Sequence, residues 1–296
     1  MSRHVLGIGE VLWDLLPTGA QLGGAPANFA YHARALGADA GVITRIGRDS
    51  LGDDILRRLD VMGLPAGLVQ RDASAPTGTV TVQLSADGVP QFTIHEDVAW
   101  DRLGTTEAAL AAVADADAVC FGSLGQRCEP ARSSIRQLVS AVRPAALRVF
   151  DINLRQHFYS QEVIEHSLQQ TNVLKLNEAE LPVLAALFGL SGSVSRQLAE
   201  LARRFELKVV ALTRGPQGSL LLGPGGWFDQ PGLPVEVQDT VGAGDAFTAA
   251  LTVGLLQGMA LEVVNRLANE VARHVCSCAG ATPPLPAHLK AAFATP

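Results

Sequence analysis

The stretch DTVGAGDAF, residues 239–247, places two glycines around a small residue, directly before an aspartate and an apolar, helix-like segment. Gly242, Ala243 and Gly244 carry little or no side chain, so their backbone N–H groups can point toward one anion at a helix start. Asp245 follows in the first turn, where an acid stabilises the helix dipole by about 0.3–1 kcal/mol. A carboxylate beside an anion site can also take a proton from an attacking hydroxyl group. The spacing alone leaves both interpretations open.

Two common phosphate-binding motifs are absent from the sequence. Phe247 stands where GxGxxG has its third glycine, and no strand–loop–helix unit of the dinucleotide type follows. No GxxxxGK[ST] segment occurs anywhere in the chain, which excludes a P-loop at the level of motifs. The anion site that residues 239–247 predict is therefore of another kind.

Apolar strand patterns alternate with helical patterns along most of the chain. Strands are expected at HVLGIG, AGVITRIG, AVCFGSL, LRVFDIN, NVLKLN, KVVALTRG and SLLLG, and helices at residues 27–36, 244–257 and 261–278 among others. This repetition predicts an α/β fold with a doubly wound, mostly parallel sheet flanked by helices. We expect a single domain over residues 1–296.

One segment, TGTVTVQLSADGVPQFTIHED, has a different pattern. Apolar and polar residues alternate on both sides of Asp87-Gly88, which predicts an antiparallel hairpin with one face in water. We expect it to form a small antiparallel layer inserted in the α/β domain.

Bulk composition narrows the classes of protein. The chain is 48% hydrophobic and has a formal net charge of -6, which argues against a general nucleic-acid or anionic-membrane binder. No uninterrupted apolar run approaches about 18 residues, and the first residues resemble a strand and not a signal peptide. The four cysteines form no CxxC pair. We expect a cytoplasmic protein with small-molecule partners.

A second glycine cluster, QLGGAPANFAYHARALG, precedes the first predicted helix. Asn28 stands at the start of that helix, where it is either an N-cap or a ligand for a polyol. Asp14, after the first strand, is either an exposed turn acid or an acceptor for sugar hydroxyl groups.

Taken together, the two glycine-rich segments closely resemble the signatures of the ribokinase-like, or PfkB, family of carbohydrate kinases. DTVGAGDAF resembles the C-terminal signature, and GGAPANFAYHARALG with IGRDSLGDDI resembles the N-terminal one. The similarity runs from Val5 to about Pro284, and GEVLWDLLP, HEDVAWD, FDINLRQ and LKLNEAEL are most similar to bacterial fructokinases. The resemblance implies phosphorylation of a sugar primary hydroxyl by ATP, with D-fructose converted to fructose 6-phosphate. The alternatives are 2-keto-3-deoxygluconate, ribose or a nucleoside as substrate, and, outside catalysis, a sugar or nucleotide sensor.

The resemblance also implies roles for individual residues. Asp245 is similar to the general base, the amides of Gly242, Ala243 and Gly244 to the anion hole, and Arg155 to a basic residue that reaches the sugar or the γ-phosphate. Residues similar to sugar ligands are Asp14, Gly24 and Asn28, with His95, Trp100 and Asn153 as further substrate candidates. Residues similar to nucleotide-binding positions are Asn177, Thr213, Gly215, Gly218 and Asn269.

Two cation sites follow from the same resemblance. Asn177 and Glu180, in NEAE, are similar to an NxxE motif that organises Mg²⁺ and phosphates through water, although a helix cap with an acidic first turn is the alternative. Asp239 and the Val241 carbonyl correspond to ligands of a monovalent cation. The tail CAGATPPLP carries prolines where some relatives have polar residues, which leaves activation by K⁺ open.

Segments of about residues 12–22 and 76–100 resemble the β-lid of the family, which closes over the sugar and excludes water. The exposed face of such a lid pairs with another subunit in several relatives, so a homodimer through the lid is an expectation that the sequence does not decide.

Overall fold

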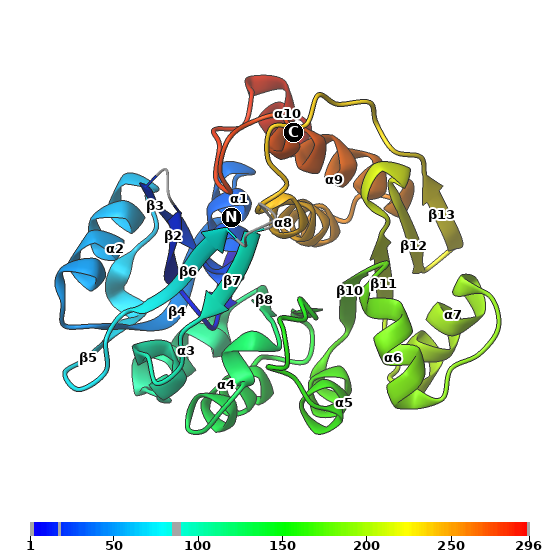
Figure 1. Cartoon of the computed structure of the whole chain (residues 1–296). Coiled ribbons are helices and arrows are strands. Elements are labelled where there is room, and N and C mark those ends of the chain that lie inside the picture. Colours follow the sequence, from blue (N-terminus) through cyan, green and yellow to red (C-terminus); the bar gives the residue numbers. More distant parts are fainter. Residues whose placement is uncertain (1–2, 17–18, 85–89, 295–296) are drawn as a thin grey trace.

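Nine strands form one large, mostly parallel sheet in the computed structural model, which describes residues 3–16, 19–84 and 90–294 (Figure 1). The strand order is β13-β12-β11-β10-β9-β8-β1-β4-β5. The strands span β1 His4–Ile8, β4 Asp39–Gly47, β5 Val69–Asp72, β8 Ala118–Phe121, β9 Leu147–Asp151, β10 Val173–Asn177, β11 Val209–Thr213, β12 Ser219–Gly223 and β13 Gly226–Gln230. Only β12 and β13, at one edge, run antiparallel to their neighbours.

The chain reverses its winding direction at β1. It passes from β1 to β4 and β5 on one side, and returns through β8, β9, β10 and β11 on the other. Ligands of such sheets bind outside the carboxyl ends of the strands at the point of reversal, here β1 and β8. The doubly wound sheet predicted from the sequence is confirmed.

Helices cover both faces of this sheet (Figure 1). Alternate strand residues separate two cores, as with Val5 on one face and Leu6 on the other. The face of Val5 packs against α1 Ala25–Ala35, α2 Ser50–Val61, α8 Ala243–Leu256, α9 Leu261–Cys276 and α10 Ala287–Ala292. The face of Leu6 packs against α3 Glu107–Asp115, α4 Ala131–Ser140, α5 Gln161–Gln170, α6 Glu180–Phe188 and α7 Val194–Arg204. None of the helices in the described part of the chain is long and apolar enough to span a membrane.

A second sheet of four strands carries the segments expected as a lid. Its order is β3-β2-β6-β7, with β2 Leu12–Leu16, β3 Gly19–Gly23, β6 Gly78–Leu84 and β7 Pro90–Ile94. The pairs β2–β3 and β6–β7 are antiparallel hairpins, and β2 and β6 join them in parallel. The expected turn at Asp87-Gly88 lies outside the described residues.

Three elements were not anticipated from the sequence. Strands β5 and β13 are short edge strands without a sustained apolar pattern, and α10 lies within the proline-rich tail. The last long helix ends at Cys276, two residues earlier than expected.

Candidate active site

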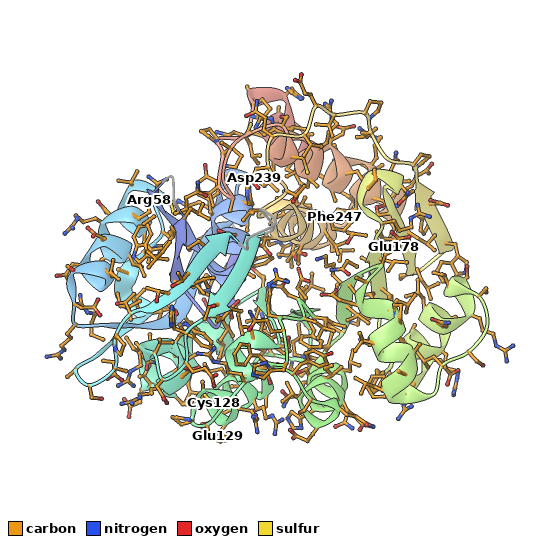
Figure 2. All side chains as sticks on the ribbon, viewed as in Figure 1. Arg58, Cys128, Glu129, Glu178, Asp239 and Phe247 are labelled. Carbon is orange, nitrogen blue, oxygen red and sulfur yellow. The ribbon has the colours of Figure 1, made fainter. Side chains whose placement is uncertain are left out.

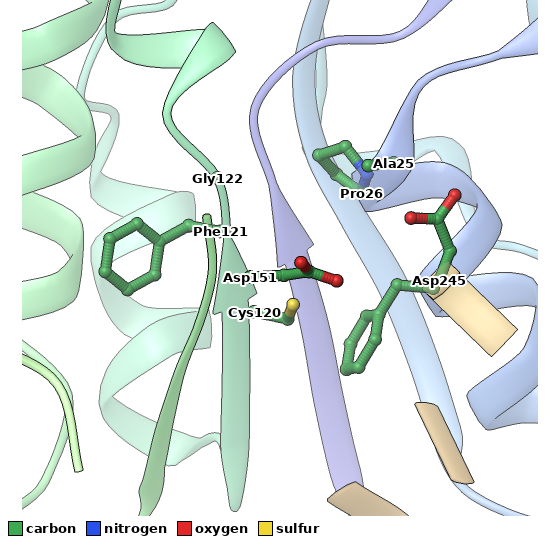
Figure 3. Close-up of a pocket in the computed structure, with 8 residues that line it drawn as sticks. Ala25, Pro26, Cys120, Phe121, Gly122, Asp151 and Asp245 are labelled. Atoms are coloured by element: carbon green, nitrogen blue, oxygen red, sulfur yellow. The ribbon is translucent and has the colours of Figure 1, made fainter. Parts of the chain in front are cut away.

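A pocket lies at the reversal point of the large sheet, between the carboxyl end of β8 and the starts of α1 and α8. It is lined by Ala25, Pro26, Phe29, Cys120, Phe121, Gly122, Asp151 and Asp245. Figure 3 shows the carboxylates of Asp151 and Asp245 at this pocket. Residues from the two glycine-rich segments therefore meet there, together with the end of strand β9.

The start of α8 has the geometry that DTVGAGDAF requires. Gly242 is the N-cap residue, with φ 78°, and no side chain caps the helix. A Cβ atom at Gly242 would lie 2.5 Å from the Ala281 carbonyl oxygen, so only glycine fits. The Ala243 N–H donates to the Thr240 carbonyl at 3.3 Å. The Ala243 N–H is thus partly committed to Thr240, and no side-chain cap occupies the other amides of the first turn, as an anion site needs.

Asp245 lies in this first turn and contacts the other signature directly. The Asn28 amide donates to the Asp245 carboxylate, with 2.9 Å between Nδ2 and Oδ2. Burial and the neighbouring Asp151 carboxylate raise the pKa of Asp245 to about 6, although Asn28, Lys175 and Arg155 oppose the rise. A carboxylate with this pKa is ionised at neutral pH and still basic enough to accept a proton.

The expected sugar-binding residues gather on the same side. Burial raises the pKa of Asp14, on β2, to about 6, and the Arg155 guanidinium lowers it in part. Arg155 also acts on Asp245, so its positive charge lies within electrostatic range of both acids. Gly24 has φ 111°, and a Cβ atom there would lie 2.5 Å from the Glu10 carbonyl oxygen. The structure therefore brings Asp14, Gly24 and Arg155 to the side of the site where α8 places Asp245.

Two of the weaker substrate candidates lie apart from the pocket lining. Trp100 is 1% exposed, in a cluster with Leu12 and Phe158 under the small sheet, and the Arg127 guanidinium lies 4.0 Å from its ring centre. Trp100 therefore packs in a hydrophobic core cluster, and its contact with the substrate stays a prediction. His95 is exposed, with 2.7 Å between its Nε2 and the Thr81 hydroxyl.

Asn153, the third weaker candidate, follows β9 and has φ 48°. This left-handed conformation is uncommon outside glycine, although asparagine tolerates it better than most residues. It lies two residues before Arg155, so the turn after β9 directs both.

The expected nucleotide-binding residues lie at the ends of β11 and β12. Thr213 ends β11, Gly215 and Gly218 have φ 53° and 86°, and a Cβ at Gly218 would collide with the Gln230 carbonyl. Asn269, on α9, donates to the Ser219 hydroxyl at 2.6 Å. The tight turn is thus built into the fold, and the Asn269 amide is partly committed to it.

Asn177 and Glu180 fit a cation through water better than by direct ligation. Both Glu180 carboxylate oxygens accept backbone N–H groups, from Leu154 at 2.9 Å and from Asn177 at 2.7 Å. The Asn177 side-chain oxygen accepts from the backbone N–H groups of Ala179 and Glu180. Within the described residues, no group of three or more His, Cys, Asp or Glu side chains could hold a metal ion.

Asp239 joins two loops through its own carboxylate (Figure 2). One oxygen accepts the Val241 N–H at 3.0 Å and the other accepts the Gly280 N–H at 3.1 Å. The Ala281 carbonyl of the same tail is held by His32 at 2.9 Å. These contacts hold the loops together, and the monovalent-cation site at Asp239 and the Val241 carbonyl stays a prediction.

Four buried polar residues of this region were missed from the sequence: Glu10, Asp151, Lys175 and Thr248. Asp151 ends β9, and Lys175 lies within the apolar strand β10. A charged residue inside an apolar strand is rarely buried without a partner, and this signal was available in FDIN and LKLN. Their convergence was not, because it depends on the strand order.

Comparison with known proteins agrees with the fold and the two signatures. A family model described as pfkB family carbohydrate kinase matches residues 18–288. A fructokinase of Escherichia coli is 32% identical over 267 residues, which cover 86% of this chain and 85% of that protein. A fructokinase of Xylella fastidiosa with bound ATP shares the fold, with a TM-score of 0.85 at 21% identity over 99% of this chain and 98% of that one.

A protein of Pyrococcus horikoshii described as a sugar kinase is 30% identical over 287 residues, covering 90% of this chain and 88% of that protein. Its structure in complex with ATP superposes with a TM-score of 0.81 over 94% of both chains. Because the family model spans nearly the whole chain and the two signatures meet in one pocket, the chain belongs to the pfkB family of carbohydrate kinases.

Proposed function

We propose that this kinase transfers the γ-phosphoryl group of ATP to a primary hydroxyl of D-fructose, giving fructose 6-phosphate. The observation that carries the proposal is the direct contact of Asn28 with Asp245 at the uncapped start of α8. In this arrangement Asn28, which would bind the sugar, contacts Asp245, which would activate the sugar hydroxyl, beside the helix start that would bind the phosphate. The fructokinase relative of E. coli supports the choice of sugar.

In this proposal, Asp245 accepts the proton of the sugar hydroxyl as that oxygen attacks the γ-phosphorus. The bond from the γ-phosphorus to the β,γ-bridging oxygen breaks, and ADP leaves with the bonding electrons. The amides of Gly242, Ala243 and Gly244 stabilise charge on the transferred group, and Arg155 adds a positive charge at the sugar end. Asp14 and Asn28 hold the sugar hydroxyl groups.

ATP would lie along the ends of β10, β11 and β12, beside Thr213, Gly215, Gly218 and Asn269. The ATP-bound relative of P. horikoshii supports ATP as co-substrate. Asn177 and Glu180 would hold Mg²⁺ through water, consistent with carboxylate oxygens that already accept backbone N–H groups. When bound, Mg²⁺ would neutralise charge on the phosphates.

A second substrate class has one observation in its favour. Arg155 is exposed and acts electrostatically on Asp14, Glu10 and Asp245, so a cation faces the sugar end of the site. A keto acid such as 2-keto-3-deoxygluconate would use it to bind its carboxylate.

The two substrates are distinguished by a panel of sugars in an ATP-dependent assay of ADP release. We expect the highest kcat/KM for fructose, with Asp245→Asn as the inactive control. A higher kcat/KM for the keto acid, lost in Arg155→Ala, would favour the second class. Repeating the panel with Na⁺ in place of K⁺ tests the monovalent-cation requirement. Turnover of no sugar by a folded protein would contradict the proposal.

A further inference from the structure

Three buried polar residues form a ring beneath the candidate anion hole. Lys175, on β10, donates to Asp151, on β9, with 3.0 Å between Nζ and Oδ1. The other carboxylate oxygen of Asp151 accepts the Thr248 hydroxyl of α8 at 2.7 Å. These three residues are at most 5% exposed. Burying two charges costs free energy that their attraction repays only with good geometry and further hydrogen bonds, so a buried ion pair is weak evidence for a purely stabilising role.

The ring closes on Gly244, in the first turn of α8. The Thr248 hydroxyl also lies 2.9 Å from the Gly244 carbonyl oxygen, although its single proton serves only one acceptor at a time. On the other side, a Cβ atom at Gly244 would lie 3.1 Å from the Lys175 ammonium. Thr248 therefore contacts this turn from within α8 and Lys175 contacts it from β10, where glycine leaves room for the ammonium group.

The ring also determines the charge beside Asp245. Lys175 pairs with Asp151 at 3.0 Å, and the carboxylates of Glu180 and Asp245 lie within electrostatic range of its ammonium group. The groups that face Asp245 come from six places: Asp151 on β9, Lys175 on β10, Arg155 after β9, Asn28 on α1, Glu10 after β1 and Cys120 on β8. Among the charged groups, Asp151 acts most strongly on Asp245.

We propose that Asp151, Lys175 and Thr248 are positioning residues for the kinase reaction. Their ring fixes the first turn of α8 against the ends of β9 and β10, and its paired charges balance the site around Asp245. The inference rests on the proposed function, since it assigns Asp245 as the base. It predicts that one substitution can disturb the position of the first turn of α8 without changing a charge. Another substitution can change the charge beside Asp245.

The geometric part is tested with two isosteric substitutions on the same helix. Thr248→Val removes the hydroxyl that bonds Asp151 and changes no charge. Thr252→Val is the matched control, because Thr252 is equally buried and bonds only the Thr248 carbonyl, at 2.7 Å. We expect kcat to fall about tenfold in Thr248→Val, because small displacements of positioned groups slow the reaction strongly. In Thr252→Val we expect kcat to change less than twofold. Equal effects of the two substitutions would overturn this part.

The charge part is tested by Asp151→Asn, which keeps an acceptor for Lys175 but loses the negative charge. The acid limb of kcat/KM, which reports Asp245, should move to lower pH by about one unit. Thr248→Val should leave that limb in place, because no charge changes. An unmoved limb in Asp151→Asn would overturn the charge part. If that variant does not fold, Asp151→Asn with Lys175→Met leaves no unpaired charge, and we expect a smaller shift of the same sign.

A readout without substrate separates this inference from the proposed function. Titration of the aspartate carboxyl carbons by ¹³C NMR, with Asp245 assigned by its loss in Asp245→Asn, follows the base directly. We expect its midpoint to fall in Asp151→Asn and to stay in Thr248→Val. Absence of turnover by the wild-type protein would contradict the proposed function alone. An unchanged NMR midpoint in Asp151→Asn would contradict the inference whatever the substrate is.

Discussion

Two groups of helices in this protein begin in different ways. At α2, α3, α5 and α7 a side-chain oxygen accepts a backbone N–H of the first turn, and the residues that do so are Asp49, Thr106, Ser160 and Ser193. At α1 and α8 the N-cap is a glycine with positive φ, Gly24 at 111° and Gly242 at 78°, and no side chain caps the turn. A capped turn satisfies its own donors, whereas an uncapped turn leaves them for a ligand.

The two helices that begin at a glycine are also neighbours. Helix α1 packs on α8, and Asn28 in the first turn of α1 bonds Asp245 in the first turn of α8. Helices α4, α6, α9 and α10 also begin without a side-chain cap, at Pro130, Ala179, Ala260 and Pro286. The contrast is therefore between the four side-chain caps and the two glycine turns that lie at one pocket. Each prediction below alters one side of this contrast.

The largest effect is expected from Asp245→Asn. The amide can still accept the Asn28 bond but cannot take the proton of a hydroxyl, so kcat should fall by about 10²–10⁴. The KM for ATP should change little, because the nucleotide residues lie elsewhere. Steady-state kinetics measures both constants. A kcat within tenfold of wild type would show that Asp245 only stabilises the helix dipole.

Gly242→Ala should have the next largest effect. An alanine there is strained by its positive φ and would also contact the Ala281 carbonyl oxygen, at 2.5 Å from the new Cβ. We expect kcat to fall by more than about tenfold, as small misplacements at a catalytic turn do, with a lower melting temperature. Kinetics and thermal unfolding measure the two effects.

Gly258→Ala is the matched control for that substitution. Gly258 has φ 69°, and nothing lies within 4 Å of a Cβ atom there. Its variant should lose about 1 kcal/mol of stability and keep its kcat. Comparable losses of kcat in the two variants would mean that backbone strain, and not closure of the uncapped turn, limits turnover.

The sequence predicts the contrast only in part. The positions of both glycine-rich turns, the parallel sheet and the small second sheet follow from local patterns and from the family resemblance. The ring of Asp151, Lys175 and Thr248 does not, because its members are distant in sequence and meet only through the order of β9, β10 and α8. Trp100 was expected near the substrate from the family resemblance. Its burial under Arg127 depends on packing that no local pattern contains.

Glu10, beside the glycine turn of α1, should make the stability of the protein depend on pH. Glu10 lies against the Ala25 N–H at the start of α1, and one carboxylate oxygen is buried without a partner. Burial raises the pKa of Glu10 to about 7. Because this pKa is raised on folding, its contribution to stability is complete below about pH 4.5 and is lost as pH rises through 7. Glu10→Gln, which cannot ionise, should therefore stabilise the protein relative to wild type at pH 8 but not at pH 4.5.

Urea unfolding of both proteins at the two pH values measures this difference. We expect a change of order 1–3 kcal/mol in the relative stability between them. A constant difference at both pH values would mean that Glu10 remains ionised in the fold, with its unpartnered oxygen hydrated.

The smallest effect is expected from removing a cap on the other side of the contrast. The Thr106 hydroxyl accepts the Ala109 N–H at 3.1 Å, and α3 packs on the face of the large sheet opposite α1 and α8. Thr106→Ala should lower the free energy of unfolding by about 1 kcal/mol and leave kcat and KM unchanged, as urea unfolding and steady-state kinetics would show. The Ala109 N–H donates to the Thr106 side chain within the same turn. Loss of this hydrogen bond should therefore not alter the pocket. A kcat reduced more than twofold with the fold intact would contradict this expectation. It would mean that the N-terminus of a capped helix also affects turnover.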